Sequence, residues 1–291
     1  MPFLHFLPLQ SSSGVSSFYW QQSMSNQPFV LPNIRKLFVP DKGYMLFDCD
    51  LSGADAQVVA WDAEDDDLKA AFRAGEKIHV KNLEDLHGRK FDPVGDRKPI
   101  PGHRYSAYDE LKRSIHATNY GSSARTLAIT LGWKVGQATE FQHRWFTLHP
   151  AIRRWHLRVE RDLQTTRSVC NKFGYRIQYF DRVASLFTKA LAWIPQSTVG
   201  IVCSKGGVAL HKEVPWLEPL LQVHDSLVFQ IPYSRVTPAS LERIKDLLHV
   251  PVPYQDELVI PWELSASTVS WGDCKKCDWA DAGNILSEVL R

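Results

Sequence analysis

LLQVHDSLVFQIP, residues 220–232, is the stretch that decides the fold. Apolar residues of one parity recur along it, at Leu221, Val223, Leu227, Phe229 and Ile231. This alternation predicts a strand or hairpin with one buried face, yet Asp225 falls on the same parity. Because an unpaired carboxylate is costly to desolvate, either a tight turn at His224-Asp225 swings it outward or a cation binds it. Both interpretations put Asp225 at a site, whereas a plain turn cap is the structural alternative.

A second apolar strand that ends in an acid favours the site. The segment YMLFDCD, residues 44–50, follows a turn at Pro40 to Gly43 and precedes a break at Ser52-Gly53 and then a helix. Asp48 and Asp50 share one face of this predicted strand. The chain therefore places acids at two separate strand ends.

Composition sets broad limits on the protein. The 291 residues are 44% hydrophobic, enough for one large domain or two subdomains, and the net charge of +2 is too small to indicate nucleic-acid binding by itself. Of five cysteines only Cys274 and Cys277 are close, and no further pair of ligands lies nearby, so we expect reduced surface thiols instead of a zinc site. The sequence shows no signal peptide and no apolar run of 18 residues, which predicts a soluble intracellular protein.

A helix-rich block is expected between the two strand-bearing parts. Asp65 to Asp67 are interpreted as a helix cap, and residues 88–104 as a long loop. A helix is predicted from Tyr108 through residue 133. Four of its residues recur every fourth position and form one polar, aromatic and cationic stripe, although an ordinary solvated face would show the same pattern: Tyr108, Lys112, His116 and Tyr120.

The second half of the chain alternates helices and strands. We expect strands around the glycine of residues 173–180 and a helix, or a helix pair interrupted near Pro195 and Gly206-Gly207, over residues 186–211. A capped helix and a closing strand follow the hairpin. The order of strands and helices along the whole chain predicts an α+β fold.

Three ordered segments resemble the polymerase motifs of family A DNA polymerases, the family of bacterial DNA polymerase I and many phage enzymes. The first is FVPDKGYMLFDCDLSGADAQVVAW, residues 38–61, followed at matching distance by AAFRAGEKIH. The second is LKRSIHATNYGSSARTLA, residues 111–128, and the third is QVHDSLVF, residues 222–229. The resemblance extends from about Arg35 to the C-terminus, and three ordered motifs are far more specific than the His-Asp pair alone.

The resemblance implies a right-hand polymerase architecture that lacks most of the thumb, with an antiparallel palm sheet and inserted helical fingers. Under it, residues 1–34 are an irregular lead-in, 35–61 palm, 62–165 fingers, and 166–291 palm with the His-Asp hairpin and the C-terminal strand. The only notable Asp-x-Glu pair, Asp62 and Glu64, lies inside the part that resembles the palm, so it cannot be an exonuclease motif. No proofreading exonuclease is therefore expected.

The resemblance also implies roles for individual residues. Asp50 and Asp225, with the carbonyl of Leu51, match the ligands of two Mg²⁺ ions, which Mn²⁺ could replace, and Lys112 matches the lysine that contacts the triphosphate and protonates pyrophosphate. Asp48 lies near these residues but does not match a ligand position of the family, so we interpret it as a structural residue. The incoming nucleotide is expected to meet His79, Lys112, His116, Tyr120 and Asp55. Primer-template DNA is expected to meet Gln196, His224 and, more weakly, Arg176.

Several residues depart from the family pattern. Asp55 replaces the glutamate that excludes the ribose 2′-hydroxyl, so ribonucleotide exclusion is expected to be looser. Ser226 replaces the second acid of the usual His-Asp-Glu, and His116 replaces an aromatic residue. Tyr108 stands where the family has an arginine, for which Arg104 or Arg113 could substitute.

The function expected from the resemblance is template-directed DNA synthesis without proofreading, in the cytoplasm of a bacterial or phage-infected cell, near the nucleoid. Its partners would be primer-template DNA, dNTPs and, as an option, a separate chain that carries a thumb or exonuclease, but no membrane. A single-subunit RNA polymerase is a second interpretation, which Asp55 disfavours. A split-polymerase subunit or a non-catalytic nucleic-acid-binding remnant is a third.

Overall fold

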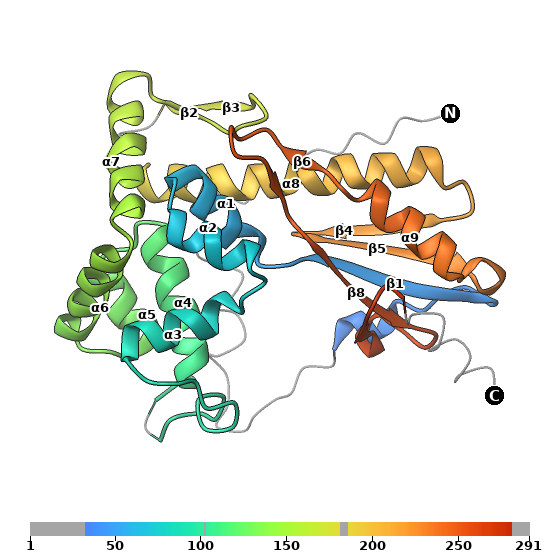
Figure 1. Ribbon diagram of the computed structural model, residues 1–291, viewed down its shortest axis with the longest axis horizontal. Coiled ribbons are helices and arrows are strands. Elements are labelled where there is room, and N and C mark those ends of the chain that lie inside the picture. Colours follow the sequence, from blue (N-terminus) through green and yellow to red (C-terminus); the bar gives the residue numbers. More distant parts are fainter. Residues whose placement is uncertain (1–32, 102, 181–185, 281–291) are drawn as a thin grey trace.

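A five-stranded antiparallel sheet forms the centre of the protein (Figure 1). The computed structural model describes residues 33–101, 103–180 and 186–280, so residues 1–32 of the lead-in expected at residues 1–34 lie outside the described residues. The strand order is β4-β5-β1-β8-β9. The strands are β1 Tyr44–Leu51, β4 Glu218–Val223, β5 Ser226–Pro232, β8 Trp262–Ser267 and β9 Lys275–Cys277. The strand predicted at residues 44–50 and the hairpin around residue 225 are both confirmed.

The hairpin differs from the prediction in its burial. β5 lies between β4 and β1, and the residues of β5 before Pro232 are buried on both faces, so the expected single buried face is wrong. On one face, Phe229 stacks on Phe47 of the neighbouring strand β1, while Val228 packs with Leu46 and Trp271 on the other. A central strand has neighbours on both faces, which the sequence of one strand cannot reveal.

A run of helices separates β1 from the second half of the chain and lies beyond one end of the sheet (Figure 1). Asp65 caps α2 by accepting a hydrogen bond from the Leu68 N–H at 3.0 Å, as predicted, and also contacts His149. The long helix α8 passes along the sheet and contacts β4 and β5. The helices of the run are α1 Ala54–Ala63, α2 Asp66–Arg73, α3 Ile78–His87, α4 Ala107–Asn119, α5 Ala124–Leu131, α6 Val135–Leu148 and α7 Pro150–Thr165.

Short elements complete the fold. A small hairpin connects α7 to α8, and α9 follows the main hairpin. These elements are β2 Ser168–Cys170, β3 Arg176–Gln178, α8 Phe187–Glu213, α9 Pro238–Leu247, β6 Pro251–Val252 and β7 Leu258–Val259, with short 3-10 turns at η1 Ile34–Leu37, η3 Tyr233–Arg235 and η4 Trp271–Asp273. The architecture confirms the predicted α+β class.

Two element boundaries were predicted wrongly, and one open alternative is decided. The helix expected through residue 133 breaks after α4, because Gly121 takes a left-handed conformation and Ser123 caps α5. Of the two alternatives for residues 186–211, the structure has the single helix, because α8 continues through Pro195 without interruption. The first strand of the small hairpin lies upstream of residues 173–180, at β2.

The break after α4 gives a prediction about stability. A Cβ at Gly121 (φ +74°) would lie 2.8 Å from Leu191 Cδ1 and 2.9 Å from Phe187 Cε1. Gly132 has almost the same φ, +75°, but a Cβ added there would meet no atom within 4 Å. We expect Gly132→Ala to lower the free energy of unfolding by about 1–2 kcal/mol through backbone strain, and Gly121→Ala by about 1–3 kcal/mol more. Denaturant unfolding measures both, and equal losses would contradict the tight contact with α8.

The cysteine pair lies at the sheet edge. Burial and then the charge of Asp48 raise the pKa of buried Cys49 on β1, and Cys274 and Cys277 lie close enough to add to this shift.

Within the described ranges no group of three His, Cys, Asp or Glu side chains could hold a metal ion. The part of the chain described here also contains no helix both long and apolar enough to cross a membrane.

Candidate functional site

The site lies where β1 ends and the β4–β5 hairpin turns. Asp50 pairs in register with Ser226, the first residue of β5, and Asp225 forms the turn with His224. His224 has a left-handed backbone (φ 55°), which a two-residue hairpin turn requires. The Leu51 N–H donates to the Asp225 carbonyl at 3.0 Å. Two residues 175 positions apart in sequence are thus held on adjacent strand ends, as predicted.

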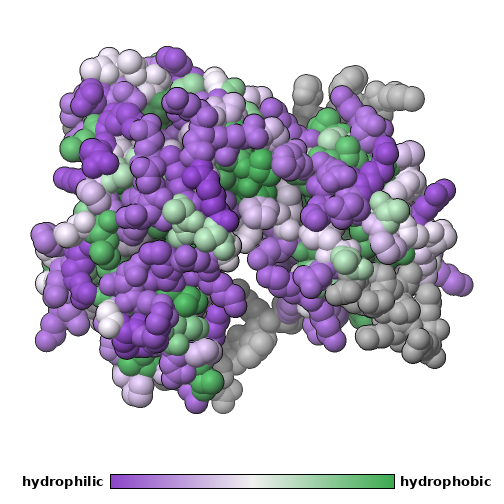
Figure 2. Space-filling view, in the orientation of Figure 1, coloured by the Kyte–Doolittle hydropathy of each residue, from purple (hydrophilic) through white to green (hydrophobic). Residues whose placement is uncertain are grey.

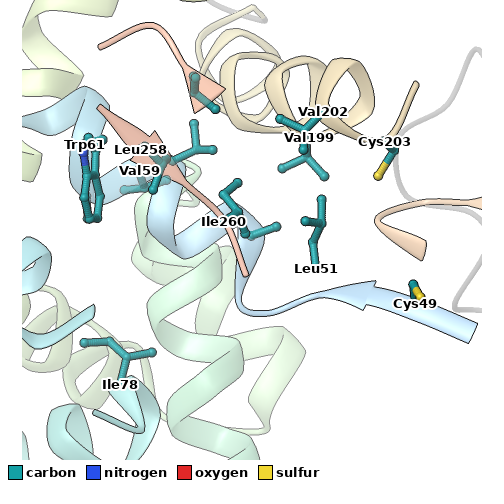
Figure 3. Packing of buried hydrophobic residues seen from close by; sticks show 14 of the residues in the cluster. Cys49, Leu51, Val59, Trp61, Ile78, Val199, Val202, Cys203, Leu258 and Ile260 are labelled. Carbon is teal, nitrogen blue, oxygen red and sulfur yellow. The ribbon is translucent and has the colours of Figure 1, made fainter. Parts of the chain in front are cut away.

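Hydrophobic packing fixes this strand end. Leu51 is buried, and Figure 3 shows its side chain facing Val199 and Val202 of α8, with Cys203 and Cys49 close by. Burial and then the charges of Asp225 and Asp50 raise the pKa of Cys203 to about 12. Both carboxylates therefore lie within electrostatic range of the same side chain of α8.

Asp50 is in a strongly acidic environment. Burial, followed by the charges of Asp225, Asp48 and Glu263, raises its pKa to about 7, against a weaker opposing effect of Arg35. Glu263 lies directly across from Asp50 on β8, accepts a hydrogen bond from Ser52 and pairs with Lys276 at 2.7 Å. This third acid could not be identified from the sequence, because only the β1–β8 register brings it to the site.

Asp48 has a structural environment. Trp271 Nε1–H donates to its carboxylate at 2.6 Å, and the Ser226 hydroxyl donates to its other oxygen. Two donors from different elements hold this side chain among the packed residues of the sheet. The structure therefore supports leaving Asp48 out of the site, and it gives Ser226 a role in holding Asp48.

Asp55 joins the sheet end to the helix α4. The Tyr120 hydroxyl donates to Asp55 Oδ2 at 2.5 Å, and the His116 ring lies 4.2 Å from the Tyr120 ring, centroid to centroid. Burial raises the pKa of Asp55, and Asp225 contributes to the same upward shift. Burial also lowers the pKa of His116, which Asp55 opposes. Asp55 is thus near Asp225 on one side and α4 on the other.

The predicted stripe of α4 faces the same region. Burial lowers the pKa of His79 on α3 to about 4, with additional effects from Lys112 and His116. His79 Nδ1 is buried and, among the described residues, has no hydrogen-bonding partner. The His79 ring packs edge-on against Tyr108, 6.1 Å between centroids. Lys112 is exposed, so its ammonium group is available to a ligand.

The arginine beside Tyr108 is Arg97. Its guanidinium carbon lies 4.4 Å from the Tyr108 ring centroid. Arg104 and Arg113, the two substitutes considered from the sequence, lie over Tyr105 instead, at 5.5 Å and 4.4 Å. Arg97 comes from the long loop before α4, so no helical spacing could have indicated it.

The three residues expected to meet DNA are all exposed but lie on different elements. His224 is in the β4–β5 turn and contributes to the electrostatic environment of Asp55. Gln196 lies on α8, one turn before Val199. Arg176 begins β3 of the small hairpin. His224 thus belongs to the turn that carries Asp225, whereas Gln196 and Arg176 lie on α8 and β3.

The donor set suits a hard divalent cation. Asp50 and Asp225 provide carboxylate oxygens, the ligands that Mg²⁺ prefers, and their mutual repulsion would be relieved by a cation. The Leu51 N–H points toward the Asp225 turn. Because the N–H and carbonyl of a residue in an antiparallel strand point to the same side, the Leu51 carbonyl also faces this turn. Since Mg²⁺ usually keeps several waters or phosphate oxygens, two carboxylates and one carbonyl are a sufficient protein contribution.

A notch opens beside this site. Figure 2 shows the surface hollowed between the helical part and the sheet, near the end of β1 in the orientation of Figure 1. The acids of the sheet lie near the α4 stripe, because Asp225 and His116 both act on Asp55 and the Tyr120 hydroxyl donates to it. Such a site can hold a metal-bound polyanion between carboxylates and a lysine.

Comparisons with known proteins agree on one family. The sequence profile described as "DNA polymerase family A" matches residues 22–272. The chain is similar to thermostable DNA polymerase I of Thermus filiformis, 30% identical over 75% of this chain and 26% of that protein, and to the Thermus aquaticus enzyme, 27% identical over 82% and 29%. DNA polymerase I of Pseudomonas aeruginosa is 27% identical over 68% and 22%. The chain spans about a quarter of the length of these relatives.

A solved structure shares the fold. It is described as the POL domain of Pol1 from M. smegmatis in complex with DNA primer-template and dNTP, with a TM-score of 0.70 and 20% sequence identity. The match covers 83% of this chain and 42% of that one. At this identity the similarity concerns the fold, and it supports the expected arrangement of antiparallel sheet and helical insertion.

Proposed function

The chain belongs to DNA polymerase family A, and from that membership we propose that it adds deoxynucleotides to the 3′-hydroxyl of a primer on a DNA template. The observation that carries the proposal is the meeting of Asp50 and Asp225 opposite the α4 stripe, joined through Asp55 and Tyr120. A primer-extension assay with purified protein, dNTPs and Mg²⁺ tests it. No extension with either Mg²⁺ or Mn²⁺ would contradict it.

In this proposal Asp50, Asp225 and the Leu51 carbonyl hold two Mg²⁺ ions. Bound Mg²⁺ supplies activation of the primer hydroxyl and neutralises charge on the triphosphate. Lys112, which is exposed on α4 and lies near His79 and His116, contacts the triphosphate and donates a proton to the leaving pyrophosphate. His79, on α3 close to Lys112, contacts the incoming phosphates.

The nucleotide sugar and base meet the other end of the stripe. His116 and Tyr120 form a tilted ring pair against which a base or sugar can pack. Asp55, held by the Tyr120 hydroxyl, lies at the position that excludes a ribose 2′-hydroxyl. Gln196 and His224 contact the primer-template end, and Arg176 contacts template phosphate.

A split polymerase is the alternative. In this alternative a separate chain that carries a thumb or exonuclease binds the chain and completes the polymerase. A weak extension activity that rises when such a chain is added would favour this form over an independent enzyme. Binding of primer-template without extension in any mixture would favour a non-catalytic remnant.

Asp55 gives a prediction about sugar selection. Asp is one methylene shorter than the glutamate it replaces, and this leaves more room for a ribose 2′-hydroxyl. We expect Asp55→Glu to raise the preference for dNTP over rNTP about tenfold, the effect typical of one methylene in a binding pocket. Single-nucleotide incorporation with matched dNTP and rNTP measures the ratio. Tyr120→Phe is the companion variant, since it removes the hydroxyl that holds Asp55. A ratio that Asp55→Glu leaves unchanged would show that Asp55 does not contact the sugar.

A further inference from the structure

The small hairpin between α7 and α8 presents an aromatic side chain to solvent. Tyr175, at the turn between β2 and β3, is 61% exposed, although large aromatic side chains are usually buried. Arg176 follows it and is exposed. Lys205 of α8 approaches the same turn, with its ammonium nitrogen 4.4 Å from the centroid of the Phe173 ring. The turn therefore combines an open aromatic ring with two cations.

A buried asparagine holds this turn in one conformation. Asn171 is 4% exposed, and its side-chain oxygen accepts hydrogen bonds from the backbone N–H groups of Phe173 and Tyr175, both at 3.1 Å. Its backbone N–H also donates to the Tyr175 carbonyl at 2.9 Å. The position of Tyr175 is thus set before any ligand arrives, which lowers the entropy cost of binding.

The same asparagine fixes the turn to α8. The Asn171 side-chain amide donates to the Ser197 hydroxyl at 2.9 Å. Ser197 is adjacent in sequence to Gln196, and Figure 1 shows the hairpin beside the N-terminal half of α8. The turn is therefore next to the part of α8 that the proposed function assigns to the primer-template.

We propose that Tyr175 is a stacking platform for an unpaired base of the template strand, with Arg176 and Lys205 binding the adjacent phosphates. An exposed ring can stack only on a base that is not paired, and such stacking tolerates any sequence because every base has an aromatic face. Arg176 and Lys205 are both exposed, Arg176 next to Tyr175 and Lys205 beside Phe173 of the same turn, so each can bind a phosphate of the stacked nucleotide or of its neighbour. The inference rests on the proposed function, because that function places the template here.

Equilibrium binding to three DNAs tests the proposal: a primer-template with a 5′ template overhang, the same duplex with blunt ends, and the unprimed template strand. We expect Tyr175→Ala to weaken binding of the overhang substrate about tenfold and to leave blunt-duplex binding unchanged. Tyr175→Phe keeps the ring and should bind like the wild type. Val94→Ala, at an exposed position (62%) of the loop before α4, is the surface control. Tyr175 is exposed, so its replacement should not disturb folding.

A fluorescent base locates the contact. With 2-aminopurine placed at successive overhang positions, wild-type protein should quench the fluorescence at one position, and Tyr175→Ala should not. Equal loss of overhang and blunt-duplex affinity, no loss at all, or no DNA binding by the wild type would each overturn the proposal. Primer extension by the wild type is measured separately. Extension with no effect of Tyr175→Ala on binding refutes only the stacking platform, whereas overhang-specific loss without any extension refutes only the polymerase.

Discussion

Replacing Asp225 by Asn is expected to lower the rate of primer extension by at least about a thousandfold, with a similar loss for Asp50→Asn. Several kcal/mol of transition-state stabilisation depend on the metal ions that these carboxylates hold, and about 4 kcal/mol corresponds to a factor of a thousand. The neutral amide keeps the shape of each side chain, so the fold should survive. Rapid-quench measurement of single-nucleotide addition gives the rates.

Asp48→Asn is the matched control. It lies on the same strand and face as Asp50, but Trp271 and Ser226 already donate to its carboxylate. An asparagine can still accept from Trp271, so we expect a change in extension rate of less than about threefold. If Asp48→Asn costs as much as Asp50→Asn, the assignment of the metal ligands is wrong.

A second readout does not depend on activity. Because a ligand that binds only the folded state stabilises it, Mg²⁺ should raise the melting temperature of the wild type, and less so that of Asp225→Asn. An equal rise in both proteins would mean that Mg²⁺ binds elsewhere. This result would contradict the site even if extension were lost for another reason.

The acid pair could be predicted from sequence because each acid ends a short, strongly apolar segment. Alternation indicated an acid at the end of each strand, at Asp50 and Asp225, and the resemblance to family A polymerases implied that the two acids meet. The α4 stripe was equally predictable, since residues four apart on a helix share a face. These features depend on local periodicity, and the structure confirms the elements that carry them.

The features that sequence reasoning missed depend on contacts between distant segments. Glu263 reaches Asp50 only through the β1–β8 register, and Arg97 reaches Tyr108 from a loop without periodicity. For a similar reason the sequence could not decide between a continuous α8 and a helix pair interrupted near Pro195. A proline costs one hydrogen bond and local strain, and burial of the flanking residues on both sides can offset that cost.

Lys112→Met should lower the rate of nucleotide addition by about a hundredfold to ten-thousandfold, the range for loss of a general acid together with a positive charge near the triphosphate. Methionine keeps much of the apolar length of the side chain, so packing on α4 is preserved. Arg113→Met is the matched control, because Arg113 is the next residue, is also exposed, and lies over Tyr105, 4.4 Å from its ring.

The division of the Lys112 effect between kcat and KM identifies its role. If the lysine protonates pyrophosphate, kcat falls while KM for dNTP changes little. If it only binds the triphosphate, KM for dNTP rises and kcat is nearly unchanged. A loss of the same size in Arg113→Met would instead show that the rate depends on the total positive charge of α4 and not on the position of Lys112. The stripe formed by Tyr108, Lys112, His116 and Tyr120 would then no longer define the nucleotide site.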